Sequence, residues 1–414
     1  MKSEIEKIWA EEIEDSRGNP TLQVFVQAGG EVGAFSVPSG ASTGVREAYE
    51  LRDPNGQGIR LAIEKVNEVI SPILLGQDVL QQKEIDRRML ELDGTPNKNN
   101  LGGNSMVGVS IASAKAAAKI SGLENYAYLR NLAEIKPSRK IPLLYMNLIN
   151  GGKHDRNNLV FQEYQVVPYS EKVEEALEIG IRVQNSLKKI IGRELGPVSL
   201  VLGDEGGYAP PITNVRKPLE YLSKALRENS LENKARLALD VAASSFYDSG
   251  KYKVDGKSLS RKELLNLFSS LIKEFNLLSI EDPFAQEDFD GFQKLKEAET
   301  NLMVIGDDLT VTNKTLLQKA IEDKSVSGII IKPNQIGTLT ETLETMQLAR
   351  ENGVELIISH RSGETDDDFI ADLAFAFGCF GLKAGSPLKP ERMVKYQRLI
   401  KISKTQPLGG SVAK

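Results

Sequence analysis

The sequence predicts an α/β protein in which a parallel (β/α) barrel of the TIM type forms the C-terminal part and a smaller α+β domain precedes it. Six apolar runs in the second half of the chain each end on an ionisable residue: Asp240, Glu281, Asp307, Lys332, His360 and Lys383. Successive positions differ by 41, 26, 25, 28 and 23 residues, and most of these intervals fit one strand plus one helix. A chain of 414 residues also exceeds what one core usually supports, so a barrel of about 250 residues leaves room for a second domain.

The charged ends of these runs predict a functional site. Catalytic groups of a (β/α) barrel lie at the carboxyl ends of its strands, where these side chains would converge. In the plain alternative, each Asp caps the next helix and each Lys or Glu turns to solvent. The recurrence of ionisable residues at successive run ends favours convergence.

The composition excludes several classes of protein. The net charge is −5 and no basic patch appears, which argues against a nucleic-acid partner. The N-terminal stretch MKSEIEKIWAEEIED has no continuous apolar segment, so we expect neither a signal peptide nor a membrane span. A single cysteine, Cys379, suits a reducing compartment, and we expect a cytoplasmic protein. Because His154 and His360 are the only histidines, a His-rich zinc site is ruled out.

Residues 1–135 are predicted to form the α+β domain. Its hairpin consists of the runs TLQVFVQAGG and EVGAFSVP, joined at Gly29 and Gly30. Helical patterns follow in GIRLAIEKVNEVISPILL, QKEIDRRMLELDG and the alanine-rich SMVGVSIASAKAAAKISG. The polar, proline-flanked stretch EIKPSRKIP at 134–142 is the predicted boundary. Residues 136–414 then form the barrel domain that carries the active site.

The barrel domain begins with three further strand-like runs before Asp240. These runs are PLLYMNLIN, LVFQEYQVVP and SLVLGDEGG. Helix-like segments, such as RKELLNLFSSLIKEF and TLTETLETMQLARENG, separate several of the later runs. The period is therefore one of topology, without a sequence repeat.

Three of the run ends offer only carboxylate oxygens. Asp240, Glu281 and Asp307 are hard donors, which favour Mg²⁺ or Mn²⁺ and leave coordination positions open for water and substrate. Three solvated caps, the alternative, would show no dependence on metal.

Lys332 follows the most apolar of the runs, GIII, and is a candidate general base. A lysine there can lose its proton near neutral pH if burial and neighbouring cations such as Lys383 disfavour the ammonium form. A structural lysine paired with Asp307 is the alternative.

Two glutamates are predicted to form the acid of the site. Glu205 lies in GDEGG, whose glycines let the backbone bend around a reacting group. Glu163, in FQEY, could approach it and raise one carboxyl pKa by like-charge repulsion. Taken alone, GDEGG also fits an ordinary turn.

Two polar loops suit an anionic substrate. VPSGASTG at 37–44 could fold over an anion or give a hydroxyl to a second metal, although a plain turn would look similar. Arg361 and Ser362 in SHRSGET supply a guanidinium and a hydroxyl, which suit a phosphate. The groups together fit removal of a proton next to a carboxylate.

At this point the chain resembles the enolase family, the phosphopyruvate hydratases of glycolysis. The match covers nearly the whole length, in the family's order, through EIEDSRGNPT, VPSGASTGVREAYELRD, GTPNKNNLGGNSMVGVS, NGGKH, FQEY, GDEGG, LALDVAAS, SIEDPF, GDDLTVTN, KPNQIGT, SHRSGETDDDFIADL, GLKAGSP and the ER of PER. The resemblance implies an enolase-type barrel with irregular early strands, and the lysine base with Mg²⁺ that is known from enolase-superfamily sites.

The resemblance also implies the reaction and the roles of the residues. The reaction is the reversible, Mg²⁺-dependent dehydration of 2-phosphoglycerate to phosphoenolpyruvate, a lyase reaction. Lys332 removes the C2 proton, and Glu205, with Glu163 beside it, protonates the departing hydroxyl. Asp240, Glu281 and Asp307 hold the first Mg²⁺, while Ser39 ligates a second one that depends on substrate. The remaining groups bind substrate: Lys383 its carboxylate side, Arg361 and Ser362 its phosphate, and Gln162, His154 and His360 line the pocket. A homodimer or an octamer is implied.

Several positions depart from the family's pattern, and they leave two alternatives open. Lys153, Asp155 and Arg156 surround His154 with charge, Ser245 stands where Glu is common, and Lys389 and Pro390 replace an Arg and a small residue. The alternatives are a related dehydratase that acts on another hydroxy acid, and a non-catalytic binding protein.

Overall fold

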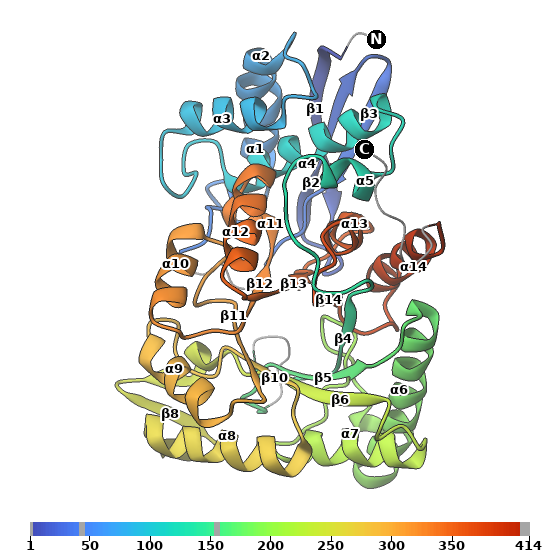
Figure 1. Ribbon diagram of the computed structural model, residues 1–414, viewed down its shortest axis with the longest axis vertical. Coiled ribbons are helices and arrows are strands. Elements are labelled where there is room, and N and C mark those ends of the chain that lie inside the picture. Colours follow the sequence, from blue (N-terminus) through green and yellow to red (C-terminus); the bar gives the residue numbers. More distant parts are fainter. Residues whose placement is uncertain (1–2, 41–45, 153–157, 406–414) are drawn as a thin grey trace.

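The computed structural model describes residues 3–40, 46–152 and 158–405 and places an N-terminal α+β region above a closed barrel (Figure 1). The N-terminal sheet has the order β1-β2-β3. The predicted hairpin is confirmed: β2 (Pro20–Ala28) and β3 (Glu31–Ser36) are antiparallel, and Ala28 pairs with Glu31 across Gly29 and Gly30. Both glycines have positive φ, which the tight turn requires.

Strand β1 (Ile5–Glu14) was not expected from the sequence. It pairs antiparallel with β2, and a register shift lies between Ile5 and Lys7. Because of this shift, the buried residues Ile5, Ile8 and Ala10 do not keep a period of two from the start of the strand. The alternation of buried and exposed residues that normally identifies a half-buried strand is therefore broken at the start of β1.

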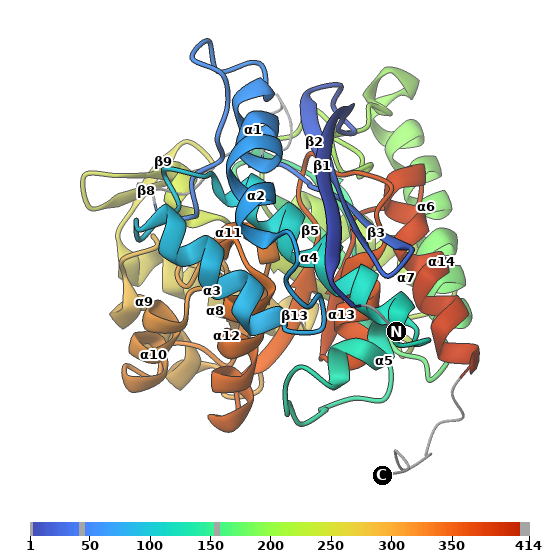
Figure 2. The same ribbon diagram turned by 90° about the horizontal axis from the view of Figure 1, so that it is seen from above.

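All three predicted N-terminal helices form. The helical elements are α1 (Arg60–Glu64), a π-helix (Lys65–Ile70), α2 (Ser71–Leu74), α3 (Gln82–Asp93), α4 (Gly103–Ile120) and α5 (Asn125–Arg130). The first predicted helix is thus a continuous run with a π-helical middle. Pro72, which has no N–H and crowds the preceding turn, is the second residue after this widened segment. Figure 2 shows α1 and α2 beside β1, which they contact.

The barrel is closed and contains eight strands, including all six that the charged run ends predicted. In chain order they are β4 (Leu143–Asn150), β5 (Glu163–Pro168), β6 (Ala235–Asp240), β10 (Ser279–Glu281), β11 (Met303–Gly306), β12 (Gly328–Ile331), β13 (Glu355–Ser359) and β14 (Gly381–Lys383). Strand β5 is antiparallel to both neighbours, β4 and β6, and the other pairs are parallel. The amino end of β5 therefore lies at the rim where the other strands end.

Helices surround the barrel (Figure 1). They are α6 (Val173–Leu195), α7 (Lys217–Glu228), α8 (Arg261–Phe275), α9 (Phe289–Ala298), α10 (Lys314–Glu322), α11 (Pro333–Ile336), α12 (Leu339–Glu351), α13 (Phe369–Ala376) and α14 (Pro390–Thr405). Short elements complete the chain: the 3₁₀ turns Pro197–Ser199 and Ala243–Phe246, and a small sheet of β7 (Tyr247–Asp248), β8 (Lys251–Val254) and β9 (Lys257–Leu259). Within the described ranges, no helix combines the length and the apolar character needed to cross a lipid bilayer.

One strand-like run was misread. SLVLGDEGG does not join the barrel, and among the described residues it pairs only through an isolated bridge between Leu202 and Tyr208. Val201 and Leu202 are 55% and 39% exposed, so their side chains do not contribute to a core as a barrel strand would. The segment is instead a loop that brings Glu205 to the barrel rim.

Helix α4 packs unusually close to the sheet at Gly33 of β3. A Cβ at Gly33 would lie 2.1 Å from the Ala112 carbonyl oxygen and 2.3 Å from the Ala116 nitrogen. Both are backbone atoms of α4 and cannot turn aside as a side chain would. The small residues of the alanine-rich run therefore let α4 approach the sheet so closely that only glycine fits at position 33.

We expect Gly33→Ala to destabilise the protein by about 1–3 kcal/mol or more, because the new methyl group forces β3 and α4 apart. The matched control is Gly192→Ala in α6, where a Cβ would lie 3.6 Å from Leu200 Cδ1 and should stabilise the helix by about 0.5–1 kcal/mol. Urea unfolding followed by circular dichroism measures both. Equal stability of the two variants would contradict the packing argument.

Candidate active site

The barrel rim brings two of the three predicted carboxylate ligands of a metal and one predicted acid around Lys383. The Lys383 Nζ lies 3.0 Å from Asp240 Oδ2, 2.8 and 2.9 Å from the two Glu281 oxygens, and 3.3 Å from Glu163 Oε1. The strand register explains the convergence, because Asp240 pairs with Glu281 on one side and with Glu163 on the other. All four side chains are buried.

This cluster carries an excess of negative charge. Burial raises the pKa of Glu281 well above its ordinary value, and the charge of Asp240 adds to the rise. Burial likewise raises the pKa of Glu163, with the charge of Glu205 as the next cause. Burial opposes the charged form of Lys383, but Asp240 and the two glutamates raise the pKa of this ammonium group well above its usual range. The cluster therefore holds its lysine protonated.

Lys332 forms an ion pair with Asp307. The Asp307 carboxylate also accepts a hydrogen bond of 3.1 Å from Gln335 Nε2. The amide oxygen of Gln335 in turn accepts a hydrogen bond of 2.9 Å from the Thr312 hydroxyl. Burial alone would lower the pKa of Lys332, but the charge of Asp307 reverses the effect and leaves this pKa raised. The protein's own groups therefore keep Lys332 protonated and paired with Asp307. They do not by themselves produce the expected loss of its proton near neutral pH.

Glu205 accepts a hydrogen bond from a residue of the barrel interior. Asn147 Nδ2, in β4, donates to Glu205 Oε2 at 2.9 Å, and His360 Nε2 lies 3.4 Å from Glu205 Oε1. Asn147 was missed at the sequence level. Its signal was a polar residue in the middle of the apolar run PLLYMNLIN, which has no reason to be buried unless it has a polar partner.

His360 is neutral in this surrounding. Burial lowers its pKa to about 4, and the neighbouring Arg392 guanidinium contributes to the fall although Glu205 opposes it. Arg392 Nη1 lies 2.7 Å from His360 Nδ1. Arg392 belongs to the PER motif, but the sequence offered no sign that this side chain would reach the site.

The predicted phosphate ligands lie on the loop after β13. Arg361 Nη1 donates to Glu47 Oε2 at 2.9 Å and to Asn334 Oδ1 at 3.0 Å. Ser362 is buried beside it, and its carbonyl oxygen accepts bonds from Arg392 Nη2 at 2.6 Å and from Ser16 Oγ at 3.3 Å. The N-terminal region therefore reaches the site.

Ser39 is held at the interface between this loop and the N-terminal region. Its hydroxyl donates to Asp15 Oδ2 at 2.7 Å and accepts from Arg17 Nη2 at 3.1 Å, while its backbone pairs with Gly363. The structure thus engages the Ser39 side chain with Asp15, and its part in binding a metal stays a prediction. Ser42, the second serine of VPSGASTG, and His154 lie outside the described residues.

Gln162 lies next to a predicted metal ligand. Its Nε2 donates to Asp240 Oδ2 at 3.3 Å, and its backbone N–H donates to the Asp240 carbonyl at 3.0 Å. Because Gln162 precedes β5, the antiparallel strand brings both Gln162 and Glu163 to the rim.

A divalent cation suits the groups of this rim. Five carboxylates, those of Glu163, Glu205, Asp240, Glu281 and Asp307, face two ammonium groups, those of Lys332 and Lys383. The raised pKa values of Glu163 and Glu281 show that this buried negative charge is under-compensated by the two ammonium groups, and a hard cation would suit the oxygen donors.

A second group of carboxylates that could hold a metal shares Asp307 with this set: Asp282, Asp307 and Asp308. Asp282 Oδ1 and Oδ2 accept the backbone N–H groups of Asp307 and Asp308 at 2.9 and 2.7 Å. Burial, with the charge of Asp307, raises the pKa of Asp308 to about 7. Asp282 therefore holds the loop that presents Asp307. Sequence reasoning missed Asp282 and Asp308, although SIEDPF and GDDL display them.

Three of the positions that depart from the family's pattern, Ser245, Lys389 and Pro390, lie among the described residues. Pro390 is the first residue of α14, where its missing N–H has no cost. The Lys389 side chain packs on Gly206, next to Glu205, because a Cβ at Gly206 would lie 2.7 Å from Lys389 Cγ. Ser245 is exposed in the 3₁₀ turn after β6. Lys153, Asp155 and Arg156 lie outside the described residues.

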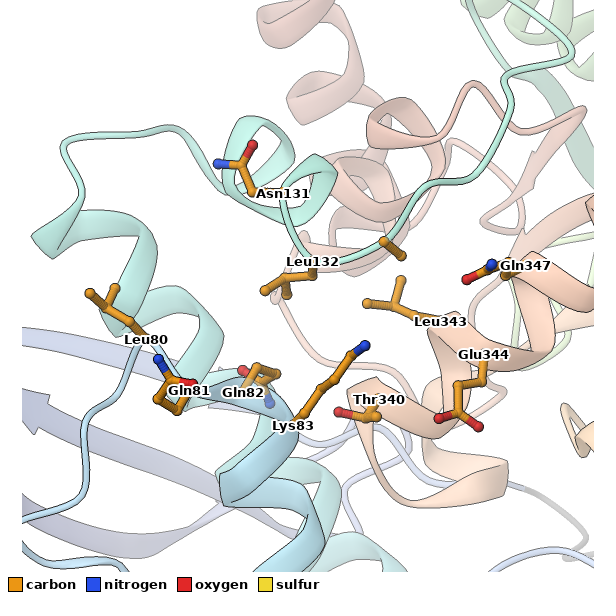
Figure 3. Close-up of a pocket in the computed structure, with 11 residues that line it drawn as sticks. Leu80, Gln81, Gln82, Lys83, Asn131, Leu132, Thr340, Leu343, Glu344 and Gln347 are labelled. Carbon is orange, nitrogen blue, oxygen red and sulfur yellow. The ribbon is translucent and has the colours of Figure 1, made fainter. Parts of the chain in front are cut away.

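A cavity lies away from these groups, between α3, the end of α5 and α12 (Figure 3). It has a volume of about 290 Å³, and its wall combines apolar side chains such as Leu132 and Leu343 with Lys83 and Glu344. None of its lining residues is a predicted site residue.

The fold and the site define a barrel protein equipped for acid–base chemistry on an anion. A family model described as the enolase C-terminal TIM barrel domain matches residues 138–412, and one for the enolase N-terminal domain matches residues 5–129. Proteins named enolase from Methanopyrus kandleri and Methanocaldococcus jannaschii are each 45% identical to the chain, over 96% of it and 95% of their own length. Enolase B of Dictyostelium discoideum is 44% identical over 96% of the chain and 94% of its own. The chain belongs to the enolase family.

The buried neutral His360 predicts a pH-dependent stability. An unfolded histidine binds a proton near pH 6.5, whereas His360 in the folded protein does so at about 4. Between these values only the unfolded chain gains the proton, so acidification through this range favours unfolding. We expect the wild type to lose about 2 kcal/mol more than His360→Gln between about pH 7.5 and about pH 5. Urea unfolding at both pH values measures this, and equal losses in the two proteins would contradict it.

Proposed function

We propose that the protein is an enolase that interconverts 2-phosphoglycerate and phosphoenolpyruvate. The observation that carries the proposal is the contact of one buried ammonium group, Lys383, with Asp240, Glu281 and Glu163. It gathers two of the metal ligands and one member of the acid pair around a single point. The names of the relatives favour this reaction over the two alternatives.

Proton transfer is assigned to groups at the rim. Lys332 takes the proton from C2 of the substrate, and Glu205 gives a proton to the hydroxyl that leaves C3, so that water is released. Asn147 holds Glu205 through its hydrogen bond. Glu163, whose pKa is raised by burial and by Glu205, keeps a second carboxyl group next to the acid.

Asp240, Glu281 and Asp307 would hold one Mg²⁺, and Ser39 is proposed to contribute to a second one that binds with substrate. Bound there, the ions would stabilise the negative charge that develops on the substrate carboxylate. The chain's own groups bind and orient the substrate. Arg361 and Ser362 bind its phosphate, Lys383 binds its carboxylate side, and Gln162, His154 and His360 complete the pocket.

The Arg361 side chain is prepared for this role. Its bonds to Glu47 and Asn334 both use Nη1, so they leave the other donors of the guanidinium fork to an anion. The two partners fix the side chain in place and reduce the entropy lost when substrate binds.

The organisation of the chain in the cell is also part of the proposal. We propose a division into residues 1–135 and 136–414, a cytoplasmic location and a homodimer or octamer. The acidic composition and the single buried cysteine support the location, and the family supports the assembly.

Lys332→Ala should lower kcat for phosphoenolpyruvate formation by at least about 10²–10⁴-fold, because it removes the base that accepts the C2 proton. The assay follows the ultraviolet absorbance of phosphoenolpyruvate with 2-phosphoglycerate and Mg²⁺. Lys314→Ala, which removes an exposed lysine paired with Glu344, is the control and should retain activity. A wild-type rate no higher than that of Lys332→Ala would overturn the proposal.

Removal of divalent metal by EDTA should abolish turnover, and added Mg²⁺ should restore it. Asp307→Asn should weaken Mg²⁺ binding measured by calorimetry, because it removes one negative oxygen ligand. Glu322→Gln, at the exposed end of α10, is the control and should bind as the wild type does. Turnover that persists in EDTA would contradict the metal assignment.

A further inference from the structure

Arg392 is a fully buried cation directly behind the site. It lies in the first turn of α14, and its side chain has no exposed surface. Nη1 lies 2.7 Å from His360 Nδ1 and donates to the Arg361 carbonyl at 2.6 Å, while Nη2 donates to the Ser362 carbonyl at 2.6 Å. Nη2 also reaches the carbonyl of Asp204, next to Glu205, at 3.5 Å. One guanidinium thus joins the loop after β13 to the loop that carries Glu205.

The contact with His360 determines where the proton of the imidazole lies. A guanidinium has five N–H donors and no acceptor, so a nitrogen at 2.7 Å from it must accept. His360 Nδ1 is therefore unprotonated, and in the neutral ring the proton lies on Nε2. This Nε2 is buried and makes no hydrogen bond among the described residues, and Glu205 Oε1 lies 3.4 Å away.

The opposite tautomer would disrupt this arrangement. It would direct an N–H at the Arg392 guanidinium and turn the lone pair of Nε2 toward the Glu205 carboxylate. With the proton on Nε2, Glu205 has an N–H donor facing each oxygen, from His360 at Oε1 and from Asn147 at Oε2. A small closing movement would convert the 3.4 Å contact into a hydrogen bond, as is common when substrate binds.

We propose that Arg392 is a positioning residue that holds His360 in its Nε2–H tautomer. In this tautomer the imidazole is a hydrogen-bond donor toward Glu205 and so orients its carboxyl group. The role of Glu205 in this inference rests on the proposed function. Selecting a tautomer through the far nitrogen is the part that a buried carboxylate plays for the histidine of serine proteases. Here a cation performs the same selection and fixes the proton on the other side.

Charged groups face His360 from three elements, and burial together with Arg392 outweighs the two carboxylates and keeps the ring neutral. Glu205 faces it from the loop before α7, Arg392 from α14 and Glu364 from the loop after β13. Glu364 is itself paired with Lys395 Nζ at 2.7 Å, also from α14. A doubly protonated ring would place a second cation against the buried guanidinium.

Nitrogen NMR of the wild type tests the tautomer directly. Because the chain has two histidines, protein labelled with ¹⁵N in histidine gives two ring spectra, and His154→Gln identifies that of His360. We expect a protonated Nε2 and a bare Nδ1 from about pH 6 to about pH 8. A proton on Nδ1, or on both nitrogens, would overturn the proposal, whether or not any variant folds.

Arg392→Met tests the cause, with Lys395→Met as the matched control. Both remove a buried cation from α14 that binds the loop after β13, but the contacts of Lys395 are with Glu364, Glu391 and Thr365. We expect Arg392→Met to give a mixture of His360 tautomers and at least about a tenfold fall in kcat, with a smaller change in KM. Lys395→Met should leave the ring spectrum of His360 unchanged.

A double variant shows whether Arg392 acts through the ring. In a His360→Gln background, Arg392→Met should lower kcat by less than about twofold further, because coupled residues are not additive. A full additional loss, or a fall in kcat with an unchanged ring spectrum, would overturn the positioning role. If the spectra show the expected dependence on Arg392 but no protein turns over 2-phosphoglycerate, the proposed function fails and the tautomer assignment stands.

Discussion

The contact of Lys383 with three buried carboxylates is the interaction on which the rim of the barrel depends. Asp240, Glu281 and Glu163 lie side by side because β5, β6 and β10 are paired, and each would be a costly unpaired charge without a cation. Burial strengthens every charge interaction in this region. The same feature that makes the cluster costly to fold also suits it to the divalent ion that is proposed to bind there.

The reversed direction of β5 supplies the rim with residues that a regular barrel would place elsewhere. In a fully parallel barrel, the amino end of a strand lies at the face opposite the catalytic groups. Because β5 runs antiparallel to β4 and β6, Gln162 and Glu163 at its amino end meet Asp240 at the carboxyl end of β6. One change of strand direction thus adds a carboxylate and an amide to the site.

The sequence predicted the features that are local in the chain. Each of the six later strands is recognised as an apolar run that ends on an ionisable residue, and the hairpin is recognised by its two glycines. The partners that decide how a site residue is held are distant: Asn147 lies 58 positions from Glu205, and Glu47 lies 314 positions from Arg361. No periodicity reports such pairs. The prediction of a strand at 199–207 was wrong because the sequence does not show whether apolar residues become buried. An exposed apolar run therefore looks the same as a strand.

The N-terminal region takes part in the site rather than only covering it. Ser16 donates to the carbonyl of Ser362, Ser39 pairs with Gly363, and Glu47 holds the guanidinium of Arg361. The loop that is proposed to bind phosphate is therefore fixed from the N-terminal side by these contacts and from behind by Arg392 on α14. Since the loop is held by two parts of the chain that meet only in the folded protein, its geometry depends on their packing. A change at this interface should alter substrate binding even where it touches no reacting group.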